Sequence, residues 1–125
     1  MLQWPSYDFR ITSAERGHNR RVQKASTVLY AGMDCLENAG RMTAADYRRA
    51  TFYTTLAPCD MCSGAALLSG IPRIVIGENR TFLGAEDHLR ACGVALTILN
   101  DPECIALMEA FQRDHTELWS EDIGE

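Results

Sequence analysis

The sequence predicts an α/β fold, and three observations favour it. From residue 51 onward, short segments rich in β-branched residues alternate with amphipathic segments of helical length. The chain has 125 residues, the length of one ordinary domain. With 46% apolar residues it can bury a core without help from disulfides or metal. We therefore expect a single domain over residues 1–125, with its sheet covered by helices.

The first half of the chain carries the weaker structural signals. Residues 7–12 alternate well enough for a strand, and residues 17–19 look like a turn. Residues 28–39 predict a helix, whose end is marked by the Asn-Ala-Gly at 38–40.

The second half predicts three buried strands. Residues 51–56 combine β-branched and aromatic side chains, and Pro58 ends this strand. Residues 73–76 and 94–99 are short apolar runs bounded by turn signals.

Helices are predicted between and after these strands. Residues 59–70 form the first, with Leu67 and Leu68 on its buried side. Residues 85–92 form a second helix, and residues 102–113 form a third that starts at a proline. The last residues, 119–125, read as a polar tail with one large aromatic side chain.

The charge balance argues against a nucleic-acid partner. Lys and Arg number 12 and Asp and Glu number 17, which leaves a net charge of −5. A general nucleic-acid binder is more often basic. The cluster of Arg16, Arg20, Arg21 and Lys24 is interpreted as a solvated face.

Composition also predicts a cytoplasmic location. No cationic stretch leads into an apolar leader, and no apolar run approaches the length of a membrane span. Five cysteines, an odd number without an export signal, indicate reduced thiols or metal ligands rather than a disulfide framework.

The strongest motif is Pro-Cys-Asp-Met-Cys at residues 58–62, where a strand passes into a helix. Cys59 and Cys62 lie on the first helical turn, where the helix dipole lowers thiol pKa values. Such a pair suits zinc, but a lone C-x-x-C also serves redox exchange or simply packs in a core. The other cysteines form no second pair: Cys35, Cys92 and Cys104.

Pro-Cys-x-x-Cys after a strand is half of the zinc deaminase signature, whose other half is His-x-Glu at the start of an earlier helix. The chemistry explains both halves: three protein ligands leave zinc an open position for water, and the Glu moves that water's proton. At the expected place this chain reads Tyr30-Ala31-Gly32.

The chain resembles the small zinc-dependent cytosine deaminases of the cytidine deaminase-like fold, from about residue 17 to residue 125. The resemblance is carried by Gly-His-Asn at 17–19, Leu-Glu-Asn at 36–38, the run at 53–62, Gly-Glu-Asn at 77–79 and Glu-Asp-Ile-Gly at 121–124. It implies a three-layer α/β/α domain with a mixed sheet that pairs into a homodimer. The implied reaction, part of pyrimidine salvage, converts cytosine and water to uracil and ammonia.

The resemblance also implies roles for six residues. Cys59 and Cys62 match the zinc thiolates, and Asn19 matches the amide that holds the pyrimidine ring. Asp122 matches the carboxylate that reads the amino and ring N–H edge, and Phe82 and Trp119 match the aromatic lid and wall. Each also has a plainer interpretation: Asn19 as a turn residue, Asp122 as a tail charge and the aromatics as core.

Two matching positions do not carry over. Tyr30 stands where the family has its ligand His, and Gly32 stands where it has the catalytic Glu. A phenol with a pKa of about 10 is a poor zinc ligand at neutral pH. Glycine has no side-chain group that can accept a proton. Asp34, Cys35 and His18 remain conceivable replacement ligands.

We therefore expect a cytosine deaminase-type protein with weakened zinc binding and impaired activity toward a pyrimidine base. One alternative is an inactive homologue, a pseudoenzyme that serves as a binding module or dimer partner. Another is a redox protein that uses Cys59 and Cys62 as a dithiol.

Residues 1–16 do not resemble the family's opening, so the N-terminal helix and first strand are expected to be missing or truncated. Three explanations stay open: a partner subunit covers the sheet, the domain is less stable than its relatives, or this start is not the natural one.

Overall fold

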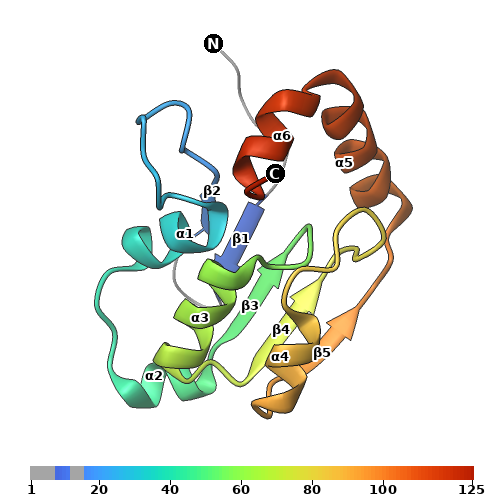
Figure 1. Cartoon of the computed structure of the whole chain (residues 1–125). Coiled ribbons are helices and arrows are strands. Elements are labelled where there is room, and N and C mark those ends of the chain that lie inside the picture. The colour runs from blue at the N-terminus through green and yellow to red at the C-terminus, as the bar shows by residue number, and fades with distance from the viewer. Residues whose placement is uncertain (1–7, 12–15) are drawn as a thin grey trace.

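The computed structural model describes residues 8–11 and 16–125 and contains a mixed five-stranded sheet in the order β2-β1-β3-β4-β5 (Figure 1). The strands are β1 (Asp8–Ile11), β2 (Arg16–His18), β3 (Thr51–Thr54), β4 (Arg73–Ile76) and β5 (Ala95–Ile98). β1 is antiparallel to both β2 and β3, whereas β3, β4 and β5 are parallel. The predicted α/β class with a mixed sheet is confirmed.

One face of the parallel strands forms the core. Phe52 pairs with Ile74, and both are buried because alternate side chains of a strand point to the same face. Tyr53 points to the other face and is 43% exposed. The helices α1 and α3 lie across the sheet in Figure 1, whereas α5 and α6 lie toward the carboxyl ends of the parallel strands.

The helical elements are α1 (Ala31–Ala39), α2 (Ala44–Arg49), α3 (Asp60–Ser69), α4 (Glu86–Ala91), α5 (Pro102–Asp114) and α6 (Thr116–Asp122). Their ends follow local chemistry. Gly70 ends α3 in the left-handed conformation, at φ 80°. Asp101 caps α5 by accepting hydrogen bonds from the N–H groups of Glu103 and Cys104. α1 begins at Ala31, three residues after the predicted start.

The turn predicted at residues 17–19 is wrong, because Arg16–His18 form strand β2 against β1. Gly17 explains the difference. A β-carbon on Gly17 would come within 2.2 Å of the Cys35 nitrogen, so glycine serves here for close packing of β2 on α1 rather than for turning.

The polar tail predicted at residues 119–125 is also wrong, because Thr116–Asp122 form helix α6. Trp119 and Asp122 are half-buried and buried, respectively, so tertiary contacts stabilise this helix. Helix α2 was not predicted. Its signal is a capping box in which Thr43 and Asp46 bond reciprocally to each other's backbone N–H groups.

The buried side of α3 was only partly predicted. Leu67 is half-buried, but Leu68 is 91% exposed. The core face of α3 is set by Cys62, Ser63 and Ala66. Leu68 follows Ala66 by two positions, about 200° around the helix axis, and therefore faces away from the core.

The first strand is present and short. β1 has four residues and pairs on both sides. The remainder of the expected strand, residues 7 and 12, lies outside the described residues. Among the described helices, none is long and apolar enough to cross a membrane.

Candidate functional site

The residues singled out by sequence meet at the carboxyl end of the sheet. A small cavity is lined by Asn19, Tyr30, Cys59, Phe82, Trp119, Asp122 and Ile123. Its volume is about 10 Å³, enough for about one water molecule. A wider cleft of about 590 Å³ opens outside it and also reaches Tyr30, Cys59 and Phe82. Such a position, beyond the carboxyl ends of parallel strands, is where α/β sheets usually bind ligands.

The two predicted thiols lie side by side. Cys59 is the N-cap of α3, and Cys62 lies on its first turn and is only 3% exposed. A hydrogen bond from the Cys62 thiol lowers the pKa of Cys59 to about 6. The same bond, together with burial, raises the pKa of Cys62 well above its ordinary value.

Two helix N-termini converge on this pair. The backbone N–H groups of Met61 and Cys62, in α3, contact the Cys59 sulfur. Those of Gly32 and Met33, at the start of α1, contact the Cys62 sulfur. N–H groups and helix dipoles at both ends favour negative charge on the sulfurs. The main chain at residue 32 is thus in contact with the pair, although Gly32 supplies no side chain.

Tyr30 does not point its hydroxyl at the thiols. It is the N-cap of α1, and its hydroxyl donates to the backbone oxygen of Asp122 at 2.8 Å. The same hydroxyl accepts a hydrogen bond from Arg21 at 2.8 Å, and the guanidinium lies 4.4 Å from the ring centroid. Burial raises the pKa of Tyr30, with Arg21 opposing it, so the phenol stays neutral at pH 7.

Asp122 is held by the chain's own side chains. One carboxylate oxygen accepts from Asn19 Nδ2 at 3.2 Å, and the other forms an ion pair with Arg21. The side chain of Asp122 is buried, and burial raises its pKa while Arg21 and Asn19 oppose the rise. The segment of residues 19–30 and α6 are therefore joined by a network of buried and half-buried polar groups.

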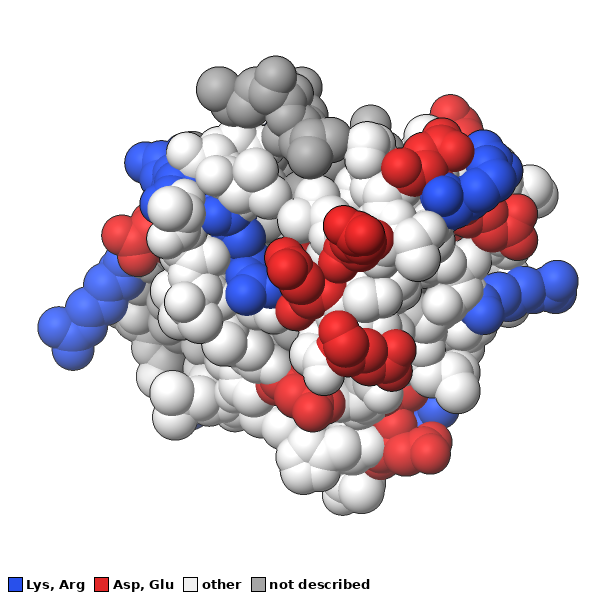
Figure 2. All heavy atoms as spheres, turned by 45° about the horizontal axis from the view of Figure 1, so that its top comes forward, with Lys and Arg blue, Asp and Glu red and all other residues white. Residues whose placement is uncertain are grey.

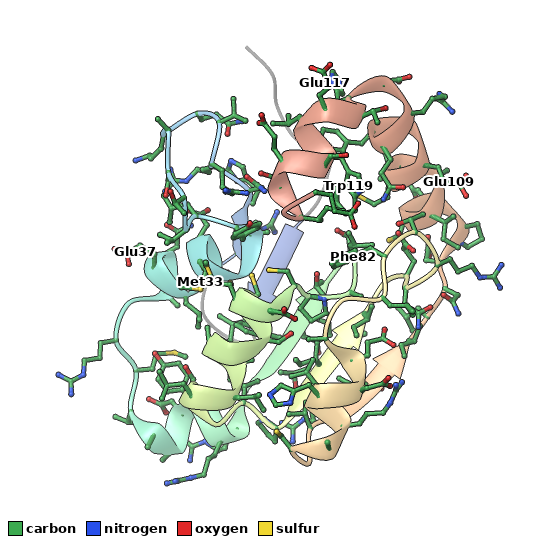
Figure 3. All side chains as sticks on the ribbon, viewed as in Figure 1. Met33, Glu37, Phe82, Glu109, Glu117 and Trp119 are labelled. Atoms are coloured by element: carbon green, nitrogen blue, oxygen red, sulfur yellow. The ribbon has the colours of Figure 1, made fainter. Side chains whose placement is uncertain are left out.

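Aromatic side chains close one side of the cavity. Phe82 and Trp119 meet edge to face, with ring centroids 5.5 Å apart and planes at 88° (Figure 3). They come from the loop after β4 and from α6, which lie far apart in the sequence.

Sequence reasoning missed the role of Arg21 in the site. It grouped Arg21 with Arg20 in a solvated basic cluster, yet each pairs with a buried carboxylate, Asp122 and Asp34 respectively. No local pattern marks these pairs, because the partners lie 101 and 14 residues away.

The replacement ligand Asp34 does not reach the thiols. Its carboxylate accepts from Arg20 Nε at 2.7 Å, from the backbone N–H of His18 at 3.2 Å and from Asn38 at 3.3 Å. Over the part of the chain that the structure describes, no group of three His, Cys, Asp or Glu side chains is arranged to hold a metal ion. The same finding shows that neither His18 nor Cys35 joins Cys59 and Cys62 as a third metal ligand in this structure.

The donor set therefore does not fit a catalytic zinc ion. Such an ion takes three protein ligands and one water. This site offers two sulfurs, and the group in the third position is a neutral phenol whose hydroxyl is bonded to Asp122 and Arg21.

Comparisons with known proteins place this arrangement in a family. The sequence profile described as "Cytidine and deoxycytidylate deaminase zinc-binding region" matches residues 11–78. A cytosine deaminase from Candida albicans is 52% identical over 110 residues, covering 88% of this chain and 73% of the relative. A tRNA-specific adenosine deaminase from Bacillus subtilis is 35% identical over 109 residues, covering 79% of this chain and 68% of the relative.

A solved structure supports the fold. A guanine deaminase from Nitrosomonas europaea superposes with a TM-score of 0.61 at 21% identity, covering 82% of this chain and 71% of that chain. The chain therefore belongs to the cytidine and deoxycytidylate deaminase family, with a cytosine deaminase among its relatives.

Proposed function

We propose that this chain is a cytosine deaminase-type protein that retains a pocket for a pyrimidine base and has largely lost hydrolytic deamination. One observation carries the proposal. The side chains that would recognise the base surround one cavity, while the two positions that would perform the chemistry hold Tyr30 and Gly32.

The loss of chemistry follows from these two positions. Deamination needs a group that takes a proton from the attacking water and delivers it to the leaving amine. Gly32 has no such group, and the Asp34 carboxylate is paired with Arg20. Tyr30, whose pKa is raised, keeps its proton, and its hydroxyl donates a hydrogen bond to the Asp122 backbone oxygen.

Recognition is supported by the pocket's polar groups. Asn19 and Asp122 line the cavity with an amide and a carboxylate, and a bound base would replace part of their bonding to each other and to Arg21. Phe82 and Trp119 offer aromatic faces on which a planar ring can stack. The cavity is too small for a base as it stands. We propose that Phe82 and Trp119 separate to admit it from the outer cleft.

A second candidate function is that of an inactive homologue that acts as a binding module or dimer partner.

We propose a homodimer as the assembly, which is supported by exposed apolar side chains on α3 and in the loop after β4. Leu68 and Leu83 are 91% and 66% exposed. We also propose the cytoplasm as its location, because its five cysteines, all among the described residues, form no disulfide.

A small base is favoured over RNA as the ligand. Two of the four basic residues in the N-terminal cluster, Arg20 and Arg21, are already paired with buried carboxylates. Figure 2 shows acidic side chains gathered in the middle of the face toward α6, with most basic ones nearer its edges. Such a surface repels a phosphate backbone.

The test separates binding from turnover. Cytosine binding is measured by calorimetry and uracil formation by chromatography, for the wild-type chain and for the double variant Tyr30→His with Gly32→Glu. We expect wild-type binding without measurable turnover, and turnover in the zinc-supplemented double variant. Full turnover by the wild-type chain would contradict the loss of chemistry, and absence of cytosine binding would contradict the retained pocket.

A further inference from the structure

We infer that Cys59 and Cys62 form a two-sulfur site that selects a soft monovalent cation of the Cu(I) class over zinc. The inference concerns the thiol pair alone and does not depend on whether a base binds. It starts from the mismatch between the donor set and the metal that the family profile names.

The number of donors favours a two-coordinate ion. Zinc is almost always bound by four ligands, of which at least three come from the protein. In the described part of the chain the pair has no third His, Cys, Asp or Glu partner. Cu(I) is satisfied by two thiolates, and soft ions prefer sulfur over nitrogen or oxygen donors.

Two cavities of unequal size reach Cys59, and zinc would have to draw its remaining ligands from the water in them. A zinc ion on two sulfurs needs two more ligands, such as waters, to complete its shell. The cavity between Cys59 and Tyr30 has a volume of about 10 Å³, which admits about one water. The outer cleft reaches Cys59 from one side and supplies a path by which a small ion enters.

The electrostatics suit a monovalent ion. Cu(I) binding releases the Cys62 thiol proton to the solvent, and two thiolates around one monovalent cation then leave a single negative charge. The N–H groups of Gly32 and Met33 face Cys62, and those of Met61 and Cys62 face Cys59. These helix N-termini stabilise the remaining negative charge without a protein cation at the sulfurs.

The surroundings are rich in soft, polarisable groups. In the sequence, Met61 comes between Cys59 and Cys62, and its side chain lines the outer cleft. Met33 follows Gly32 on α1, packs against the core and lies near α3 in Figure 3. Thioethers favour Cu(I) over zinc, whereas the carboxylates of Asp60, Glu121 and Asp122 line the same outer cleft.

The experiment compares Cu(I) and zinc on the same chain. The reduced, chelator-treated protein is titrated anaerobically with each ion against a chromophoric chelator that competes for it. We expect one Cu(I) per chain, and weaker competition for zinc. Replacing the half-exposed cysteine, Cys59→Ser, should weaken Cu(I) binding at least about tenfold, because one of two donors is lost. Cys92→Ser, an exposed cysteine on the far end of α4, is the matched control and should leave Cu(I) affinity unchanged.

The variant Tyr30→His tests the reason for the selectivity. A histidine there offers a third donor, so zinc affinity should rise at least about tenfold. X-ray absorption of the Cu(I)-loaded wild-type chain should report sulfur ligands only. Circular dichroism checks that Cys59→Ser is folded, and Cys59→Ala replaces it if it is not.

Three results would overturn the inference. The first is tight binding of one zinc per wild-type chain, unchanged by Tyr30→His. The second is Cu(I) affinity that is equal in the wild-type and Cys59→Ser chains. The third is a first shell around Cu(I) that contains nitrogen or oxygen donors.

Discussion

The two halves of the site differ in what they preserve. The α3 half keeps both its backbone and its side chains: Cys59 caps the helix and Cys62 follows on the first turn. The α1 half keeps its backbone, since the N–H groups of Gly32 and Met33 still face Cys62. Its side chains do not face the sulfurs in the same way, because the Tyr30 hydroxyl bonds to Asp122 and Arg21 and Gly32 has no side chain. The backbone of the site is therefore present on both helices, whereas a pair of side chains suited to a metal ion is present only on α3.

The largest expected effect comes from restoring the missing proton carrier on the α1 half. In a background that already carries Tyr30→His, adding Gly32→Glu should raise kcat for cytosine by about 10² to 10⁴-fold, the usual contribution of general acid–base catalysis. Steady-state uracil formation measures it. Gly32→Gln in the same background is the matched control and should give no such rise, because an amide does not carry the proton.

The two halves of the site should also differ in how well they tolerate an added β-carbon. Gly17→Ala brings a β-carbon within 2.2 Å of the Cys35 backbone and should lower the free energy of unfolding by about 2–3 kcal/mol. Gly64→Ala lies in α3 with nothing within 4 Å of the added carbon, and should stabilise by about 0.5–1 kcal/mol. Urea denaturation measures both. Equal effects of the two variants would show that the tight contact between β2 and α1 is not a constraint.

The thiol pair gives a pH-dependent prediction on the α3 half. In metal-free Cys92→Ser protein, alkylation of Cys59 should rise with pH around a midpoint of about 6. Removing the hydrogen bond with Cys62→Ala should raise that pKa and slow the reaction at pH 7 by about tenfold. Peptide mass spectrometry follows the site. A midpoint unchanged in Cys62→Ala would exclude the thiol hydrogen bond as the cause.

The sign of the accompanying stability effect follows from the direction of the pKa shift. The folded-state pKa of Cys59 is lowered from 9.0 to about 6. The stabilisation is therefore complete above the unfolded-state pKa and is lost as the pH falls through about 6. Unfolding of the metal-free protein should require more urea at pH 8 than at pH 6, and this difference should shrink in Cys59→Ser.

The last comparison, between two tyrosine hydroxyls, concerns small expected effects. Tyr30→Phe removes the hydrogen bonds to Arg21 and to the Asp122 backbone and should cost about 1 kcal/mol. Tyr53→Phe, on a side chain that is 43% exposed, should change stability by less than about 0.5 kcal/mol. A larger loss for Tyr53→Phe than for Tyr30→Phe would contradict the network that joins Tyr30 to α6.

Local sequence patterns predicted most of the elements whose signals are local, with the exception of helix α2 and its capping box. The strands β3, β4 and β5 and the helices α3, α4 and α5 follow their predicted positions closely, because β-branched runs, caps and glycine stops act within a few residues. Strand β2 and helix α6 were missed, because their stabilising contacts come from elsewhere. Gly17 is required by the approach of Cys35, and Trp119 packs on Phe82.

By itself, the sequence determined the family, the cysteine pair and the absence of a proton acceptor at residue 32, because these depend only on which side chains are present. Tertiary structure decided where those side chains point. It turned the Tyr30 hydroxyl to Asp122, paired Arg21 with the Asp122 carboxylate and placed the N–H groups of α1 against Cys62. These contacts join residues that are distant along the chain, and burial strengthens them by excluding water, so no local pattern encodes them.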